Sequence, residues 1–430
     1  MTKDDVQRVA KQYLNPQHYA LVVVGNITAL FSGSVVAQGL TALTLLLTAR
    51  QLGPSGYGQY TGSFALVSFT GILFNLGLDV WLLREGGRDP ERLKESAGSV
   101  LALKVGLGLI FVALWWGLAG WVQVSTFPPD LLRLSALTVL FDRLFLTLTT
   151  VFKAALKNRM TSLLDILSDS LWLGGTLILI GLGQETVEGF FGVRMGALGM
   201  MFGVALWMAM RVIKLSARWE IMRGALRGAF PYASSEFLTW IYMRFDVLII
   251  GFALGAQAVG LYAPAVSLVN ALFLIPAAVH AVFIPILSNL FAHHPAQAWK
   301  TAWRSVLLLT GIGLALTGGL FLGADLLVGL LGARYIASVE ILKILSLILW
   351  VHSVAFGMAA IMVALNLQGR RSFVQAIAVV VNIGLNLWIV RWLEIPGVAW
   401  VYVITEGVLV IGYAWIVVNA YRTWRASTKV

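Results

Sequence analysis

Long apolar stretches alternate with short polar ones along the whole chain. Each stretch holds about 20 residues or more, the length that an α-helix needs to cross the hydrocarbon core of a membrane. The pattern predicts an all-α integral membrane protein of about twelve transmembrane helices, without a separate soluble domain. The predicted spans are 25–48, 60–83, 98–121, 132–154, 162–182, 190–210, 231–252, 259–290, 303–324, 337–364, 373–391 and 397–420. The span at 259–290 contains three prolines, so we expect it to be kinked.

One motif occurs twice in the same register. Residues 52–60 and 254–262 both read Leu-Gly-x4-Gly-x-Tyr, and each copy is followed by Leu-Val at the same spacing. The repeat predicts two halves of similar topology, as in transporters built from two repeats around a central site. We expect the glycines to form tight turns and helix starts, and Tyr60 and Tyr262 to anchor at the lipid headgroups. A weaker echo relates 155–158 at the end of the fourth span to 364–367 at the end of the tenth.

Composition and charge support the membrane interpretation. The chain is 59% hydrophobic and 12% charged, whereas a soluble domain carries about 25% charged residues. It has no cysteine, which excludes disulfides and thiolate metal sites. The net charge of +11 could suggest a nucleic acid partner, but the basic residues form short runs between spans, as cytoplasmic loops do. With a cytoplasmic N-terminus, the inner segments hold 22 Lys and Arg and the outer segments 4. We therefore predict a multi-pass protein of the cytoplasmic (inner) membrane with both termini in the cytoplasm.

The polar segments divide the chain. We expect a six-helix bundle at 1–210, a basic cytoplasmic linker at 211–227 and a second six-helix bundle at 228–430. Residues 2–15 form either a short interfacial helix or a frayed tail. The linker is amphipathic; it serves as a connector or also contacts anionic lipids.

Ionisable residues inside the spans are candidate functional residues, because a charge in the hydrocarbon core costs several kcal/mol unless it is paired or faces water. Arg143, Arg244 and Lys104 could line a basic cavity that holds phosphate, since arginine binds phosphate bidentately and keeps its charge. Asp142, Asp246 and Glu406 could orient these groups or take up protons or sodium. Structural ion pairs between helices are the alternative for the aspartates, and Lys104 could instead extend to an interface. Asp142 and Arg143 are adjacent, so we expect them to point apart and to need separate partners. Further ionisable residues inside the spans are Glu236, the pair Asp165 and Asp169 on one helix face, His280, Lys343 and His352.

Catalytic signatures are missing from the sequence. It contains no Gly-x4-Gly-Lys-Ser/Thr loop, no dinucleotide fingerprint after a strand and no His-Glu-x-x-His. The outer loops offer only scattered carboxylates for a metal or a general base. We expect a protein that is not an enzyme and needs no cofactor.

Several segments, in the same order along the chain, resemble a known transporter family. They are 46–60, 76–79, 82–85, 242–246, 260–262, 285–288, 365–371 and 382–386. They are similar to polysaccharide-biosynthesis (Wzx-like) flippases, the oligosaccharide branch of the multidrug/oligosaccharidyl-lipid/polysaccharide transporter superfamily.

The resemblance implies two six-helix bundles related by a pseudo-two-fold axis along the membrane normal. It also implies an alternating-access flippase that moves an isoprenoid-diphosphate-linked oligosaccharide from the inner to the outer leaflet for polysaccharide biosynthesis. Arg143, Arg244 and Lys104 would then hold the diphosphate. Expected partners are this polyprenyl-linked glycan, membrane lipids and possible polysaccharide polymerases and glycosyltransferases.

Two alternatives stay open. One is a cation-coupled multidrug or small-molecule antiporter of the same superfamily, whose bacterial members often carry an acidic residue in the first span. Residues 27–47 contain none. The other is a scaffold of a polysaccharide assembly complex that transports nothing.

Overall fold

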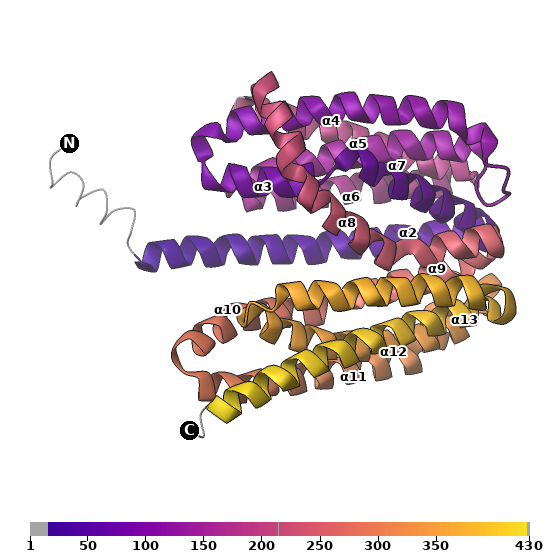
Figure 1. Cartoon of the computed structure of the whole chain (residues 1–430). Coiled ribbons are helices and arrows are strands. Elements are labelled where there is room, and N and C mark those ends of the chain that lie inside the picture. The colour runs from indigo at the N-terminus through magenta and orange to yellow at the C-terminus, as the bar shows by residue number, and fades with distance from the viewer. Residues whose placement is uncertain (1–15, 214, 428–430) are drawn as a thin grey trace.

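The computed structural model describes residues 16–213 and 215–427, and the described chain is a series of helices joined by short turns (Figure 1). The possible interfacial helix at 2–15 lies outside these residues. The helices of the first half are α2 (Pro16–Asn75), α3 (Leu78–Arg88), α4 (Pro90–Leu118), α5 (Pro129–Ala154), α6 (Asn158–Gly181) and α7 (Val187–Val212). Those of the second half are α8 (Trp219–Ala253), α9 (Ala256–Leu272), α10 (Leu274–His293), α11 (Pro295–Leu331), α12 (Ser338–Ala364) and α13 (Gln368–Ser427). Two short 3-10 turns, Ala119–Trp121 and Ala333–Tyr335, complete the described elements.

The twelve predicted spans are present. Within the described residues, eight helical stretches are long and apolar enough to cross a membrane. Two of them are bent in the middle, α2 at Gly53 (φ 67°) and α13 at Glu394 (φ 48°), so that each contributes two crossings. α5 and α8, which carry charged residues in their middle, supply the remaining two. The fold is therefore the expected all-α membrane architecture of two six-helix bundles.

The two halves form separate lobes that meet at one end (Figure 1). α3 to α7 lie in one lobe and α9 to α13 in the other, while the first half of α2 runs between them and α8 crosses the first lobe obliquely to reach the boundary near its end. Near its start, α8 packs on the first lobe, where Ala225 and Ala229 are fully buried against Leu78, Leu82 and Leu93. We propose that the lobes divide at the predicted bounds, 1–210 and 228–430.

The connection between α7 and α8 is attached to α4. The backbone N–H of Ser216 donates to the carbonyl of Lys94 at 3.1 Å. The N–H of Arg218 donates to the hydroxyl of Ser99 at 2.9 Å, and its guanidinium pairs with Glu95 at 3.0 Å. These bonds fix the basic segment as a connector held on the first lobe.

The backbone confirms the turn prediction for the repeated motif. Gly53 and Gly255 both have positive φ (67° and 91°), and a helix begins directly after each. The predicted role of Tyr60 and Tyr262 as headgroup anchors is wrong, because the two side chains are 1% and 0% exposed. The turns direct both tyrosines into the largest buried cluster of the protein, which contains residues of both lobes. The prolines of the eighth span also act as expected, since α9 ends at Leu272 and α10 begins at Leu274.

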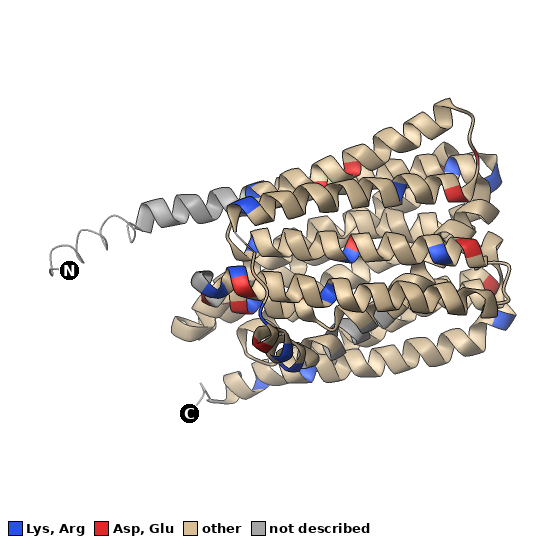
Figure 2. Ribbon diagram, turned by 90° about the horizontal axis from the view of Figure 1, so that it is seen from above, with Lys and Arg blue, Asp and Glu red and all other residues tan. Residues whose placement is uncertain are grey.

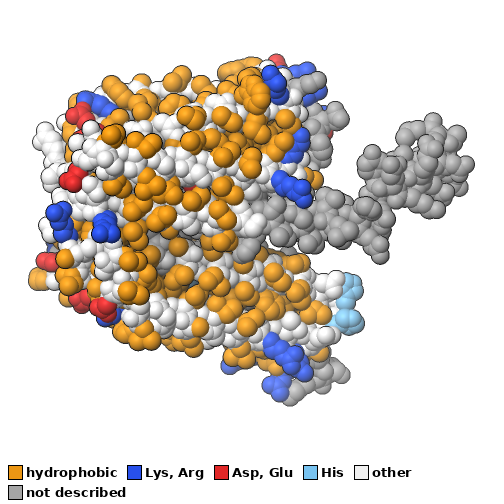
Figure 3. Space-filling model, turned by 180° about the vertical axis from the view of Figure 1, so that it is seen from behind, with side chains coloured by type: hydrophobic (Ala, Val, Ile, Leu, Met, Phe, Trp, Pro, Cys, Tyr) orange, Lys and Arg blue, Asp and Glu red, His pale blue; other side chains and the backbone are white. Residues whose placement is uncertain are grey.

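The charges follow the membrane pattern. Most charged residues lie near the helix ends, and only a few lie mid-helix (Figure 2). Seen from behind, an apolar surface covers the middle of both lobes (Figure 3). One margin of this face carries basic side chains and histidines, and the other carries acidic and basic ones. The protein is a multi-pass membrane protein whose exposed apolar side chains face lipid.

Candidate functional site

The two copies of the motif contact each other where the lobes meet. Gly58, in the first copy, lies so close to the second that a Cβ there would be 1.7 Å from the carbonyl oxygen of Ala256. Gly260, in the second copy, would likewise place a Cβ 1.7 Å from the carbonyl oxygen of Pro54. The contact is reciprocal, because Pro54 and Ala256 occupy the same position of the motif, as do Gly58 and Gly260. Only glycine allows backbones to approach so closely. We call this contact the glycine seal.

Hydrogen bonds between the halves reinforce the same end. The hydroxyl of Tyr335 donates to the carbonyl of Ala49 at 2.7 Å. The hydroxyl of Thr126 donates to the carbonyl of Gly251 at 2.8 Å. Tyr57 is 1% exposed in the same interface. Together these contacts hold the lobes closed at the end where the motif turns lie.

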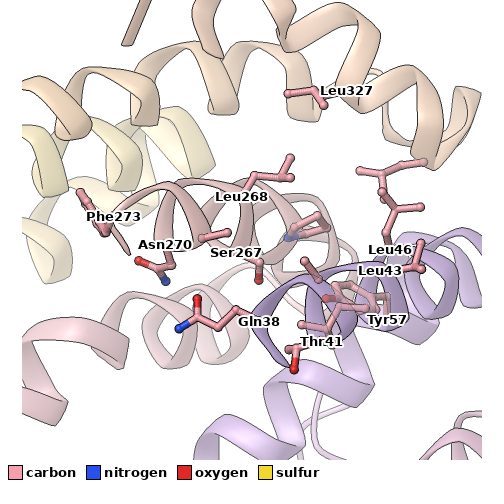
Figure 4. A pocket seen from close by; sticks show the side chains of 15 residues that line it. Gln38, Thr41, Leu43, Leu46, Tyr57, Ser267, Leu268, Asn270, Phe273 and Leu327 are labelled. Atoms are coloured by element: carbon pink, nitrogen blue, oxygen red, sulfur yellow. The ribbon is translucent and has the colours of Figure 1, made fainter. Parts of the chain in front are cut away.

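A cavity of about 530 Å³ lies next to the seal, between α2 of the first half and α9 and α11 of the second (Figure 4). Gln38 on α2 lies opposite Ser267 and Asn270 on α9 (Figure 4). The lining residues are Gln38, Thr41, Ala42, Leu43, Leu45, Leu46, Tyr57, Pro264, Ser267, Leu268, Asn270, Ala271, Phe273, Leu327 and Leu331. The cavity thus combines apolar walls with a few amide and hydroxyl groups that can donate and accept hydrogen bonds.

None of the described residues that line this cavity is charged. Five of the six predicted site residues therefore lie outside this lining. The structure puts Lys104, Asp142 and Arg143 inside the first lobe, and Asp246 and Glu406 in the second half. Arg244 belongs to α8, but its side chain lies outside the part that the structure describes.

Lys104 is held in a fully buried network. Its ammonium group lies 2.8 Å from the Asp79 carboxylate and donates to Asn75 and Thr147, both at 2.6 Å. It also donates to the carbonyl of Arg143 at 3.2 Å. Lys104 is 0% exposed, so it does not extend to an interface. The network joins α4 to α5 and to the break between α2 and α3.

Asp142 and Arg143 lie close together rather than apart. The Arg143 Nε is 3.9 Å from an Asp142 carboxylate oxygen, a loose ion pair between neighbours on α5. The expectation that they need separate partners is incomplete, because side-chain flexibility lets the guanidinium turn back toward the carboxylate. The Arg143 side chain is only 15% exposed.

Arg194 on α7 is a further basic group in the interior of this lobe. Its guanidinium lies over the Phe64 ring at 4.0 Å and the Trp172 ring at 4.7 Å. It also interacts electrostatically with Asp142 and Asp169. The lobe interior therefore holds an arginine stacked between aromatic rings and near two carboxylates.

In the second half, the predicted acids are both buried and hydrogen-bonded. Asp246 is 6% exposed; it accepts from the Tyr262 hydroxyl and from the N–H of Val247 at 2.8 Å. Glu406 is 0% exposed, and its carboxylate lies 2.9 Å from Nδ1 of His352. The tyrosine of the second motif copy thus connects the glycine seal to a buried carboxylate.

Comparison with known families fits this architecture. A family model described as polysaccharide biosynthesis protein matches residues 47–340. The chain belongs to the polysaccharide biosynthesis protein family. The match confirms the resemblance inferred from the sequence. Curated proteins give no match to the chain.

Solved structures show the fold of this polysaccharide biosynthesis family member. An inward-facing multidrug resistance MATE transporter of the MOP superfamily is 16% identical, with a TM-score of 0.72 over 90% of this chain and 96% of that one. The lipid II flippase MurJ, in an inward closed conformation, is 16% identical, with a TM-score of 0.72 over 90% of this chain and 87% of that one. A MOP superfamily transporter from Pyrococcus furiosus is 15% identical, with a TM-score of 0.62 over 91% of this chain and 94% of that one.

Several residues of this family member's site were not found from the sequence. Asp79 lies within one of the segments that resemble the transporter family, and the signal that could have found it is Lys104, because a lysine at membrane depth requires an acidic partner. Arg194 lies near the start of the predicted span 190–210, where a basic side chain is common and does not indicate a site. Gln38 and Asn270 carry no charge, so no cost of burial distinguishes them in the sequence.

Proposed function

We propose that this protein is an alternating-access flippase that moves an isoprenoid-diphosphate-linked oligosaccharide across the cytoplasmic membrane for polysaccharide biosynthesis. The observation that carries the proposal is the uncharged cavity between the lobes, whose apolar walls carry a few amide and hydroxyl groups, in a chain of the polysaccharide biosynthesis family. Amide and hydroxyl side chains both donate and accept hydrogen bonds, as sugar hydroxyls do. Gln38, Thr41, Ser267 and Asn270 would contact the glycan, and the apolar wall would exclude water.

The orientation follows from the sequence. The glycine seal would face outside, because the loops at that end are poor in Lys and Arg. The structure would then be the state closed to the outside, and the carrier would return to it after releasing cargo. Both termini would lie in the cytoplasm, where glycosyltransferases build the substrate; a polymerase would receive it outside. No chemical step belongs to the protein itself.

Binding of the diphosphate requires basic side chains, and the three candidate residues are not equally suited to it. Arg143 and Arg244 stay as candidate ligands. Arg143 has only a loose ion pair with Asp142, so its guanidinium can exchange that partner for a phosphate. Lys104 is the weakest candidate, because Asp79 neutralises it and three other acceptors surround its ammonium group.

The test is flipping in proteoliposomes. A fluorescent polyprenyl-diphosphate oligosaccharide is reconstituted with the protein, and a membrane-impermeant quencher reports the fraction in the outer leaflet. Asn270→Ala and Gln38→Ala should each raise the half-saturating substrate concentration about 2- to 10-fold, the effect of one lost hydrogen bond. Asn289→Ala removes an exposed amide on α10 outside the cavity and serves as the control.

Three results would oppose the proposal. Unchanged half-saturation in both folded cavity variants would mean that the glycan does not bind there. Normal flipping by Arg143→Gln and Arg244→Gln would remove these arginines as diphosphate ligands. Efflux of a cationic dye without any flipping of the lipid would favour the multidrug antiporter alternative.

A further inference from the structure

A second cavity, of about 780 Å³, lies between the two halves of the chain. One wall is the part of α2 that follows its bend, and the other walls are the end of α8 and the part of α13 that precedes its bend. We call this cavity the tryptophan groove. Its lining residues are Leu66, Phe69, Phe245, Leu248, Ile249, Phe252, Ala253, Leu387, Trp388, Val390, Arg391 and Trp392.

The internal repeat relates the tryptophan groove to the cavity next to the glycine seal. The two motif copies, 52–60 and 254–262, are 202 residues apart. At the same spacing, four lining residues of one cavity correspond to four lining residues of the other. The corresponding pairs are Leu66 and Leu268, Phe69 and Ala271, Leu43 and Phe245, and Leu46 and Leu248. The two cavities are therefore equivalent places in the interface between the repeats.

The two equivalent cavities differ in chemistry. The first carries amide and hydroxyl groups, on Gln38, Thr41, Ser267 and Asn270. The described lining of the tryptophan groove is apolar except for Arg391. Trp388 and Trp392 are 67% and 79% exposed, and tryptophan is typical of the boundary between hydrocarbon and headgroups. The groove thus offers an apolar surface that ends at one basic group, which matches a lipid chain and its headgroup.

Arg391 is suited to an anionic ligand. Its guanidinium forms no ion pair with a carboxylate in the described part of the chain, whereas Arg133, on the same predicted outer side, pairs with Asp130 at 2.9 Å. Arginine binds phosphate oxygens bidentately and keeps its charge. None of the described lining residues is a carboxylate that could hold the ammonium group of a zwitterionic lipid. The charge of the groove therefore complements a phospholipid of net negative charge.

We propose that the tryptophan groove binds an anionic diacyl phospholipid of the outer leaflet, with its phosphate on Arg391 and an acyl chain against Phe69 and Phe252. The bound lipid stabilises the closed state, because the walls of the groove come from both halves of the chain. Separation of α2 from α8 and α13 would take the groove apart and release the lipid. The inference goes beyond the proposed function, since the site is independent of the cargo that the carrier moves.

A binding experiment tests the site directly. Native mass spectrometry measures how much lipid stays on the detergent-solubilised protein in an equal mixture of phosphatidylglycerol and phosphatidylcholine with the same acyl chains. The unsubstituted protein should retain phosphatidylglycerol about threefold more than phosphatidylcholine, the effect of one partly exposed ion pair. Arg391→Gln should retain both lipids equally, and Arg391→Lys should keep part of the preference. Arg133→Gln removes an outer arginine that is already paired, so it should keep the full preference.

A second, cargo-free experiment tests the effect on closure. The chain has no cysteine, so spin labels can be placed on Ser55→Cys and Gln257→Cys, two exposed residues at equivalent positions of the motif turns. The population with a short distance between labels should be about threefold larger in phosphatidylglycerol vesicles than in phosphatidylcholine vesicles at the same ionic strength. Arg391→Gln should lose this difference and Arg133→Gln should keep it. Inorganic phosphate added to phosphatidylcholine vesicles should not replace the lipid.

The outcomes separate the parts of the inference. Equal retention of the two lipids by the unsubstituted protein would mean that only unspecific boundary lipid fills the groove. A preference that persists in folded Arg391→Gln would also overturn the site. A label distance that does not depend on the lipid would overturn its role in closure, and the same response to inorganic phosphate would show a site for free anions. Both experiments contain no glycan, so a protein that moves no lipid-linked glycan can still confirm the lipid site.

Discussion

Gly58 and Ala256 touch backbone to backbone across the boundary between the lobes. A Cβ on Gly58 would lie 1.7 Å from the Ala256 carbonyl oxygen, and Gly260 repeats the contact with Pro54. The motif that revealed the internal repeat is therefore also the contact by which the two repeats close on each other. Because the contact is reciprocal, each half supplies one glycine and one carbonyl.

We expect Gly58→Ala and Gly260→Ala to weaken the closed state. A methyl group at either position cannot fit, so the lobes must separate or the backbone must shift, which costs about 1–3 kcal/mol. That cost corresponds to a shift of about 5- to 150-fold in the ratio of closed to open molecules. The distance between spin labels on Ser55→Cys and Gln257→Cys measures the shift, and the double variant should open further than either single one.

Gly311→Ala is the matched control for the glycine seal. Gly311 lies in α11, where an added Cβ meets nothing within 4 Å. Its substitution should leave the label distance unchanged. A normal distance distribution in Gly260→Ala would show that the seal tolerates a side chain, and it would refute the role assigned to the glycines.

The buried ion pair of Lys104 and Asp79 predicts a loss of stability rather than of substrate affinity. Lys104→Met leaves the Asp79 carboxylate without its cationic partner, which should cost about 3–5 kcal/mol. The expected result is a lower midpoint of thermal unfolding in detergent, with the half-saturating lipid concentration of the folded fraction unchanged.

The double variant Lys104→Met with Asp79→Asn shows whether the loss of stability comes from the unpaired Asp79 charge or from the missing lysine side chain itself. Removing the orphaned charge should recover part of the unfolding midpoint. Asp325→Asn, in a partly exposed pair, should have little effect on stability. If Lys104→Met instead raises the half-saturating lipid concentration at normal stability, Lys104 binds the diphosphate.

The fold was predictable because the membrane imposes strong rules on the sequence. Spans must be long and apolar, and the alternation of basic loops limits how many can exist. The glycines with positive φ at 53 and 255 also follow from the sequence, since such turns favour glycine. The burial of Tyr60 and Tyr262 did not follow, because a tyrosine beside a turn suits a lipid headgroup and a lobe interface equally well.

The site was only partly predictable for a related reason. Ionisable residues are conspicuous in apolar spans, so Lys104, Asp142 and Glu406 could be singled out by type. Their partners depend on which helices pack together, and helix packing cannot be derived from apolar periodicity when helices are apolar on all sides. The uncharged groups at Gln38 and Asn270 became visible only once α2 and α9 were placed face to face.

Arg194 should stabilise the interior of the first lobe through both its charge and its planar shape. It stacks over Phe64 and Trp172 and lies near Asp142 and Asp169. Arg194→Lys keeps the charge but loses the planar stacking, which should cost about 1–2 kcal/mol. Arg194→Gln also removes the positive charge near the two carboxylates, so its thermal unfolding midpoint should fall further.

Arg133→Gln supplies the comparison for Arg194, because Arg133 pairs with Asp130 at 2.9 Å on the more exposed end of α5. Exposed pairs contribute little, so its unfolding midpoint should stay close to that of the unsubstituted protein. Adding Asp169→Asn to Arg194→Gln should recover stability if the carboxylate is the source of the loss. If Arg194→Lys and Arg194→Gln are equally stable, the charge contributes nothing and the arginine acts through packing alone.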